Sequence, residues 1–175
     1  ANLLTAHSSL VQAWSLTERD VNLGVLPLFH VAGLGLMLTV QQAGGASVIA
    51  SKFDPQQAVR DIAAERVTVM SEFAPMLANL MDQAKGDELT TLRRVTGLDT
   101  PATIERFEKA FPRAVFWAAF GQSETSGLAT LSPYRDRPKS AGRPLFWRTI
   151  AVVDSADKPR PTGQTGEIVV RGPTV

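Results

Sequence analysis

The chain has 175 residues, no cysteine, and a formal net charge of +1 from 18 basic and 17 acidic residues. This length can bury a sizeable core, and hydrophobic residues make up 44% of it, so we expect a globular protein. The lack of cysteine excludes disulfides and thiolate metal sites and agrees with a cytoplasmic location. The balanced charge gives no electrostatic case for nucleic acid or an anionic membrane as a partner.

Short apolar runs alternate with amphipathic segments through the first two thirds of the chain. Strands are expected over residues 21–26, 47–51, 67–70, 92–95 and 114–120. Helices are expected to begin at residues 2, 33, 55, 76 and 101, with Leu3, Leu4, Leu10, Val11 and Trp14 as the apolar set of the first. This alternation predicts an α/β fold, a parallel βαβ-type sheet flanked by helices.

The stretch from Val21 to Ser51 has no formal charge and is long enough to suggest a membrane span. Pro27, His30 and several glycines interrupt it. We therefore interpret it as a strand, a loop and a buried helix, with no transmembrane segment.

After Gly127 the composition changes. Residues 132–139 are polar and rich in proline, and residues 149–153 and 167–170 read as two strands joined by a long turn. We expect an α/β sub-domain over residues 1–131, a linker over 132–141, and the start of a smaller antiparallel β sub-domain over 142–175.

The segment from Ala114 to Gly127 is the strongest candidate for a functional site. Its first seven residues are apolar and predict a strand buried on both faces, and its last seven are small or polar and include Glu124. Ligands bind at the carboxyl ends of strands in such sheets. A carboxylate beside the hydroxyls of Ser123, Thr125 and Ser126 suits Mg²⁺ and a phosphate. The alternative is a loop whose Ser or Thr caps the next helix.

His30 follows the first strand, again at a carboxyl end. It could be a buried histidine whose ring is satisfied by backbone groups, or it could line a pocket. From the residues alone both interpretations stay open.

Four segments, in order along the chain, resemble motifs of the adenylate-forming superfamily of acyl-CoA synthetases, luciferases and peptide-synthetase adenylation domains. Phe120-Gly121-Gln122-Ser123-Glu124 resembles its Tyr-Gly-x-Thr-Glu motif. The other three are similar to its Pro-x-Phe-His-x-x-Gly, Gly-Gly-Ala-Pro and Gly-Glu-(Leu/Ile)-x-x-x-Gly-Pro segments. They are residues 27–33, 97–101 and 166–173.

The resemblance implies a role for each matching position. Glu124 would hold Mg²⁺ and Ser123 would contact the phosphate. The expected nucleotide-binding residues are Gly97, Leu98, Asp99, Ala119, Phe120, Gly121 and Gln122. His30, Phe73 and Ala74 would border the acyl pocket, to which Trp117 would add apolar surface.

The resemblance further implies an ATP-dependent acyl-CoA ligase, with ATP or AMP, Mg²⁺ and CoA as its small-molecule partners. Its substrate would be a fatty or aromatic carboxylic acid. The family's phosphate-gripping loop and its C-terminal catalytic lysine do not occur in these residues. We therefore expect an internal piece of a longer enzyme, inactive alone, and any dimer of it could be an artefact of exposed surface.

Three positions depart from the family pattern. Phe120 replaces a tyrosine, Ser123 replaces a threonine, and Ala118 stands where many members have Asn or Gln. These departures leave open a non-catalytic nucleotide-binding relative as an alternative function. Within the enzyme class, the alternative is an adenylation domain that loads a carrier protein.

Overall fold

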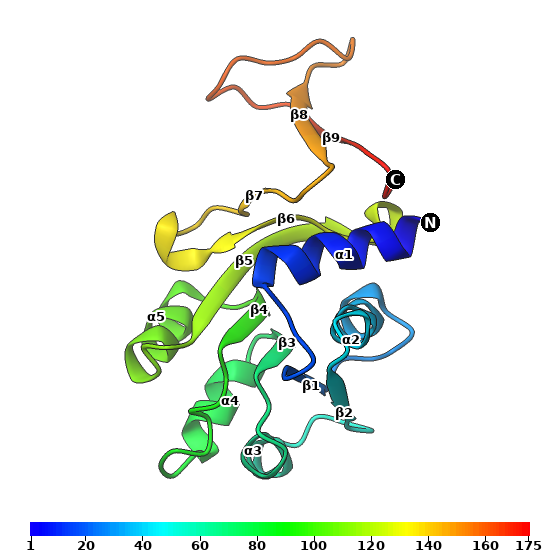
Figure 1. Ribbon diagram of the computed structural model, residues 1–175. Coiled ribbons are helices and arrows are strands. Elements are labelled where there is room, and N and C mark those ends of the chain that lie inside the picture. Colours follow the sequence, from blue (N-terminus) through cyan, green and yellow to red (C-terminus); the bar gives the residue numbers. More distant parts are fainter.

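A seven-stranded sheet forms the centre of the structure, a computed structural model that describes residues 1–175 (Figure 1). Its strands are β1 (Val21–Gly24), β2 (Ala46–Ile49), β3 (Val69–Phe73), β4 (Arg94–Leu98), β5 (Val115–Gln122), β6 (Gly127–Pro133) and β7 (Arg143–Pro144). Their spatial order is β2-β1-β3-β4-β5-β6-β7. The first five are parallel, as expected, and β6 and β7 add an antiparallel edge.

Helices cover both faces of this sheet. Helices α1 (Asn2–Trp14) and α2 (Val31–Gln42) pack together on one face, and α3 (Pro55–Ala64), α4 (Met76–Gln83) and α5 (Pro101–Ala110) lie on the other (Figure 1). Local sequence starts two of them. Asp54 caps α3 by accepting the Gln57 amide at 2.8 Å, and Thr100 caps α5 by accepting the Thr103 amide at 3.2 Å. Both caps precede a proline and confirm the predicted helix starts.

The core is split between the two faces of the sheet. A cluster of 17 buried residues, including Ile62, Leu77 and Phe107, packs beneath α3, α4 and α5. A cluster of 8, including Trp14 and Leu36, packs beneath α1 and α2. Helix α1 begins at residue 2, as predicted, but two members of its expected apolar set lie outside the core: Leu3 and Leu4 are 49% and 66% exposed.

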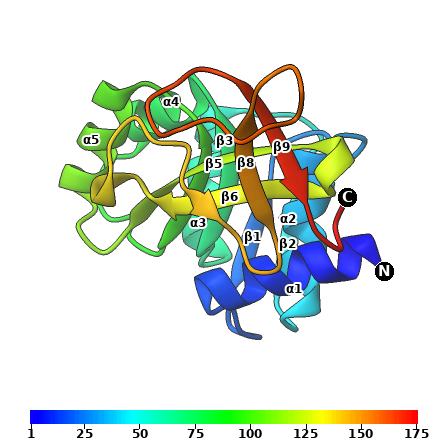
Figure 2. The ribbon, with the colours of Figure 1, turned by 90° about the horizontal axis from the view of Figure 1, so that it is seen from above.

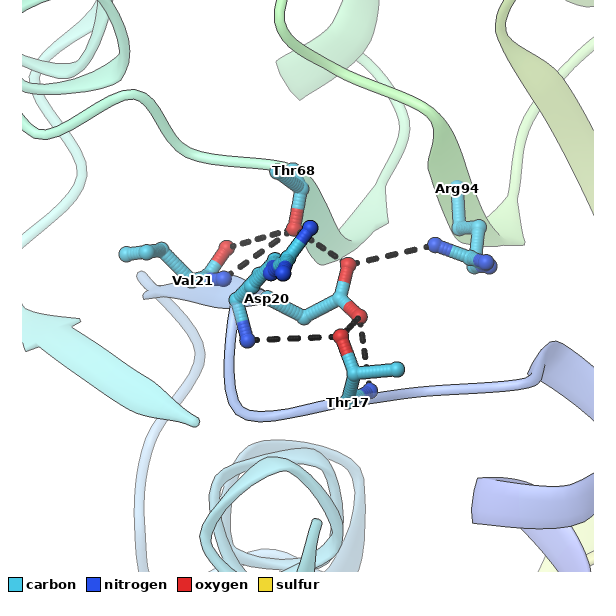
Figure 3. Close-up of polar contacts among 6 residues, drawn as sticks. Thr17, Asp20, Val21, Thr68 and Arg94 are labelled. Carbon is cyan, nitrogen blue, oxygen red and sulfur yellow. Dashed lines mark hydrogen bonds and ion pairs between the residues drawn. The ribbon is translucent and has the colours of Figure 1, made fainter. Parts of the chain in front are cut away.

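Asp20 joins three strands at the amino edge of the sheet (Figure 3). Its Oδ1 accepts hydrogen bonds from the Thr68 hydroxyl at 2.8 Å and from Arg94 at 3.2 Å. Its Oδ2 accepts the Thr17 amide at 2.9 Å. Because Thr68 and Arg94 lie at the starts of β3 and β4, this carboxylate stabilises the edge opposite the strand ends where a ligand is expected.

A separate hairpin follows the sheet. Strands β8 (Thr149–Val153) and β9 (Glu167–Arg171) form a two-stranded antiparallel sheet, as expected, which crosses above β6 (Figure 2). Arg148 donates to the Ser9 hydroxyl of α1 at 2.8 Å, and the Ser126 hydroxyl donates to the Thr174 carbonyl at 2.9 Å. These contacts attach the segments that flank the hairpin to α1 and to the turn after β5. The expected linker begins within β6, whose last two residues are Ser132 and Pro133.

Several strand ends differ from the prediction. Phe73 and Leu98 are the last residues of β3 and β4, not parts of a helix entry and a turn. Strand β5 is not buried on both faces. Of its residues only Phe116 is buried. The second half of the strand lines a cavity, and its last two residues, Gly121 and Gln122, are exposed. The uncharged Val21–Ser51 stretch divides into β1, α2 and β2, and none of the helices has the length and apolar character needed to cross a membrane.

Candidate functional site

A cavity of about 380 Å³ opens at the carboxyl ends of the parallel strands. Strands β3, β4 and β5 supply one side, and helices α1 and α2 supply the other. Half of its 24 lining residues are hydrophobic, and most of the surface that the lining presents to the cavity is apolar. A largely apolar cavity with a few polar groups is the usual form of a small-molecule site.

Most of the predicted nucleotide and pocket residues line this cavity. They are His30, Phe73, Gly97, Leu98, Ala119, Phe120, Gly121 and Gln122. Ala74, Asp99, Ser123 and Glu124 lie outside the lining. Trp117 was wrongly expected at the pocket. Its ring packs 6.0 Å from that of Trp14 in the core beneath α1.

A tight 3-10 turn, Ser123–Thr125, follows β5 and presents the candidate carboxylate. The buried Thr125 hydroxyl lies 3.0 Å from the carbonyl oxygen of Gln122 and 2.8 Å from that of Gly127. These contacts of a buried side chain stabilise the turn, whereas Ser123 and Glu124 are exposed to solvent. Glu124 forms no ion pair in the structure. The alternative of a Ser or Thr cap holds in part. The Thr125 hydroxyl accepts the Gln122 amide at 3.3 Å and so caps this short 3-10 helix, which leads into β6 and not into an α-helix.

His30 lies at the exposed rim of the cavity, as the residue before α2. Its Nδ1 accepts the Ala32 amide at 3.1 Å and so caps the helix. The interpretation as a buried histidine was therefore wrong. The hydrogen bond fixes the ring at the first turn of α2, beside the space that the cavity opens.

Glycine is required at position 97, where β4 passes β3. A Cβ on Gly97 would overlap the carbonyl oxygen of Glu72, the residue that pairs with it across the two strands. The absence of a side chain therefore lets two cavity-lining strands approach closely, as expected for a conformationally demanding position.

Glu72 is a cavity-lining residue that the sequence analysis did not assign. Its side chain is fully buried, and neither carboxyl oxygen has a hydrogen-bond partner. Burial, followed by the charge of Asp99, raises the pKa of Glu72 to about 8, so the group is neutral at pH 7. The available signal for it was a single carboxylate shortly after the predicted strand 67–70.

His7 of α1 was also missed. It lines the cavity, is 5% exposed, and has no hydrogen-bond partner for its Nε2. Burial lowers the pKa of His7 from its ordinary value, so the imidazole is neutral at pH 7. The pattern of α1 gave no signal for this role, because the cavity wall forms only when α1 packs on α2.

Comparisons with known proteins agree with the resemblance of the motifs. The model of the AMP-binding enzyme family matches residues 1–175. A 2-succinylbenzoate–CoA ligase of Bacillus licheniformis is 34% identical over 167 residues, which cover 91% of this chain and 34% of that protein. The chain thus spans about a third of the length of this curated relative.

Two solved structures are also similar to this chain. A Rhodopseudomonas palustris protein assigned as a long-chain-fatty-acid CoA ligase is 75% identical, with a TM-score of 0.98 over 99% of this chain and 44% of that one. O-succinylbenzoate coenzyme A synthetase from Bacillus subtilis, in complex with ATP and magnesium ion, is 25% identical, with a TM-score of 0.87. That match covers 99% of this chain and 37% of the synthetase chain.

Proposed function

This chain belongs to the AMP-binding enzyme family, and on that premise we propose that it forms the acid- and nucleotide-binding part of an ATP-dependent acyl-CoA ligase. The carboxylate of the substrate acid attacks the α-phosphate of ATP, which gives an acyl-adenylate and releases pyrophosphate. The thiolate of CoA then attacks the acyl carbon and displaces AMP. An acid of this kind is ionised at neutral pH, so the first step needs no general base from the protein.

The observation that carries the proposal is the position of Glu124. The turn held by Thr125 exposes this carboxylate and the Ser123 hydroxyl at the carboxyl end of β5, next to a cavity lined by Phe120 and Gly121. Hard oxygen ligands without a competing ion pair suit Mg²⁺, which commonly takes one or two carboxylates and completes its shell with substrate phosphates and water. No cluster of three or more acidic or histidine side chains is needed for that mode, and none occurs.

Each part of this site would then have a separate task. Glu124 holds Mg²⁺, which when bound neutralises charge on the phosphates, and Ser123 donates a hydrogen bond to a phosphate oxygen. Phe120 packs against the adenine ring, and Gly97, Leu98 and Asp99 border the nucleotide. His30 and Phe73 would border the entrance for the acyl chain, and Ala74 follows Phe73 directly in the chain.

The acid is proposed to be fatty or aromatic, because the cavity is largely apolar and no Lys, Arg or Asp lines it. Of the relatives named above, one is named as a ligase for an aromatic acid and one is assigned as a ligase for fatty acids, which supports either kind.

ATP–pyrophosphate exchange tests the proposal. The full-length protein that contains this chain is assayed with short, medium, long and aromatic acids, and thioester formation is followed with and without CoA. We expect exchange with one class of acid and a CoA thioester of that acid. Exchange without a CoA thioester would instead support loading of a carrier protein. No exchange from a folded protein that binds ATP would contradict the proposal.

A further inference from the structure

Two carboxyl groups meet at the carboxyl ends of neighbouring strands. Glu72 is the second-last residue of β3, and Asp99 directly follows β4. Both carboxyl oxygens of Glu72 and Oδ2 of Asp99 are buried, and none of the three has a hydrogen-bond partner. The other oxygen of Asp99 accepts the Thr100 amide at 2.6 Å. Three unsatisfied carboxyl oxygens at one place are unfavourable and need an explanation.

Gly97 provides the space in which the Glu72 side chain lies. Glu72 pairs with Gly97 across β3 and β4, and a Cβ on Gly97 would lie 2.8 Å from Oε1 of Glu72. Side chains two positions apart leave an extended chain on the same side, so Asp99 follows on the side that Glu72 covers. After burial, the charge of Asp99 is the main cause that raises the pKa of Glu72, and a hydrogen bond to Asp99 acts in the same direction.

The protonation state of the pair decides whether these oxygens are satisfied. An ionised carboxylate only accepts hydrogen bonds, so two ionised groups offer each other no donor and repel. A single proton between them removes both costs, because the carboxyl that holds it can donate to the other. Of the two, Glu72 is the more deeply buried, since Asp99 is half-buried. Glu72 therefore holds the proton at pH 7.

No other charged group competes for this pair. The elements packed on β3 are β1, β4, α2 and α4. Their charged residues are Asp82 on α4 and Arg94 on β4, and each forms an ion pair elsewhere. His7 and His30 line the same cavity, and His7 is neutral at pH 7. Only the charge of Asp99 acts on the carboxyl of Glu72.

From this geometry we infer that Glu72 is a positioning residue, whose protonated carboxyl donates a hydrogen bond to Asp99 and so holds the end of β4 against β3 for nucleotide binding. The inference rests on the proposed function, in which Gly97, Leu98 and Asp99 border the nucleotide. When Glu72 loses its proton at high pH, the two carboxylates repel each other and the end of β4 moves away from β3. Affinity for the nucleotide therefore falls as pH rises.

ATP binding as a function of pH tests this consequence. The dissociation constant of ATP in the presence of Mg²⁺ is measured by calorimetry on the full-length protein at pH 7, 8 and 9. We expect it to rise about tenfold by pH 9, because only about one molecule in ten keeps the proton one unit above a pKa of about 8. Partial unfolding would lower the fraction of protein that binds and not the dissociation constant.

Two substitutions at position 72 separate hydrogen bonding from packing. In Glu72→Gln the amide donates to Asp99 at every pH, so the variant should bind ATP like the natural chain at pH 7 and should not weaken by pH 9. In Glu72→Leu no donor remains, so ATP binding should be weaker at every pH, by about tenfold for one lost hydrogen bond. Glu65→Gln, at an exposed position after α3, is the control and should keep the natural pH dependence.

Infrared spectroscopy detects the proton without any ligand. A protonated carboxyl has a carbonyl stretching band that a carboxylate lacks, and ordinary Asp and Glu side chains are ionised at pH 7. We expect this band in the full-length protein at pH 7, its loss as pH rises through about 8, and its absence in Glu72→Gln.

The outcomes separate this inference from the proposed function. Equal affinity for ATP at pH 7 and 9, or the same loss of affinity in Glu72→Gln, would overturn the inference alone. A missing carboxyl band at pH 7 would do the same. The expected pH dependence of ATP binding, together with no exchange for any acid, would contradict the ligase function and support the inference, because the inference depends only on nucleotide binding.

Discussion

At the scale of single residues, the buried carboxyl of Glu72 makes stability depend on pH. The folded state keeps this proton up to a pKa of about 8, whereas the unfolded chain releases it near 4.5. Unfolding therefore releases a proton between these values, and stability falls as pH rises through that window. pH 7 lies about 2.5 units above the ordinary pKa of a glutamate. The free energy of unfolding lost by that pH, relative to acidic pH, is therefore about 3 kcal/mol at most.

Glu72→Gln should remove that dependence. We expect the variant to gain in free energy of unfolding relative to the natural chain as pH rises from 5 to 8, because an amide does not ionise. Urea unfolding at pH 5, 7 and 9 measures it. Glu65→Gln, at an exposed position after α3, is the control and should follow the natural chain. Equal pH profiles for the natural chain and Glu72→Gln would show that Glu72 ionises normally.

At the scale of elements, the Asp20 contacts hold together the starts of β1, β3 and β4 (Figure 3). Asp20→Asn should lower the free energy of unfolding by about 3 kcal/mol, because the half-buried Arg94 loses its only ion-pair partner. Chemical denaturation measures this loss. Glu18→Gln breaks only the exposed contact to Arg19 at 3.8 Å and should have little effect. If both variants unfold alike, the Asp20 contacts do not stabilise this edge.

How far the elements could be predicted depended on how local their signals are. Asp54 and Thr100 each act on an amide three residues away, so the starts of α3 and α5 followed from sequence. The ends of β3 and β4 did not, because Phe73 and Leu98 are extended by pairing with each other across the sheet. The motif residues on β5 were found from a family pattern, whereas His7 enters the site only through the packing of α1 on α2.

At the scale of the whole molecule, the β8–β9 hairpin and the seven-stranded sheet should differ in local stability. Strands β8 and β9 have one buried residue between them, Val153, whereas β3 has three. We expect amides of β9 to exchange with solvent on the order of 100-fold faster than those of β3, measured by hydrogen exchange with mass spectrometry. This result would support a sub-domain over residues 142–175. Equal protection would mean that both sheets open together.

Glu124→Gln tests the central claim most directly, that the turn after β5 presents a metal-binding carboxylate for adenylation. The measurement is acid-dependent ATP–pyrophosphate exchange by the full-length protein, with Glu65→Gln as the control on a distant exposed carboxylate. We predict a loss of about 100-fold for Glu124→Gln, the usual size when one charge-stabilising group is removed, with unchanged folding and an unchanged control. Full exchange activity in Glu124→Gln would contradict the account.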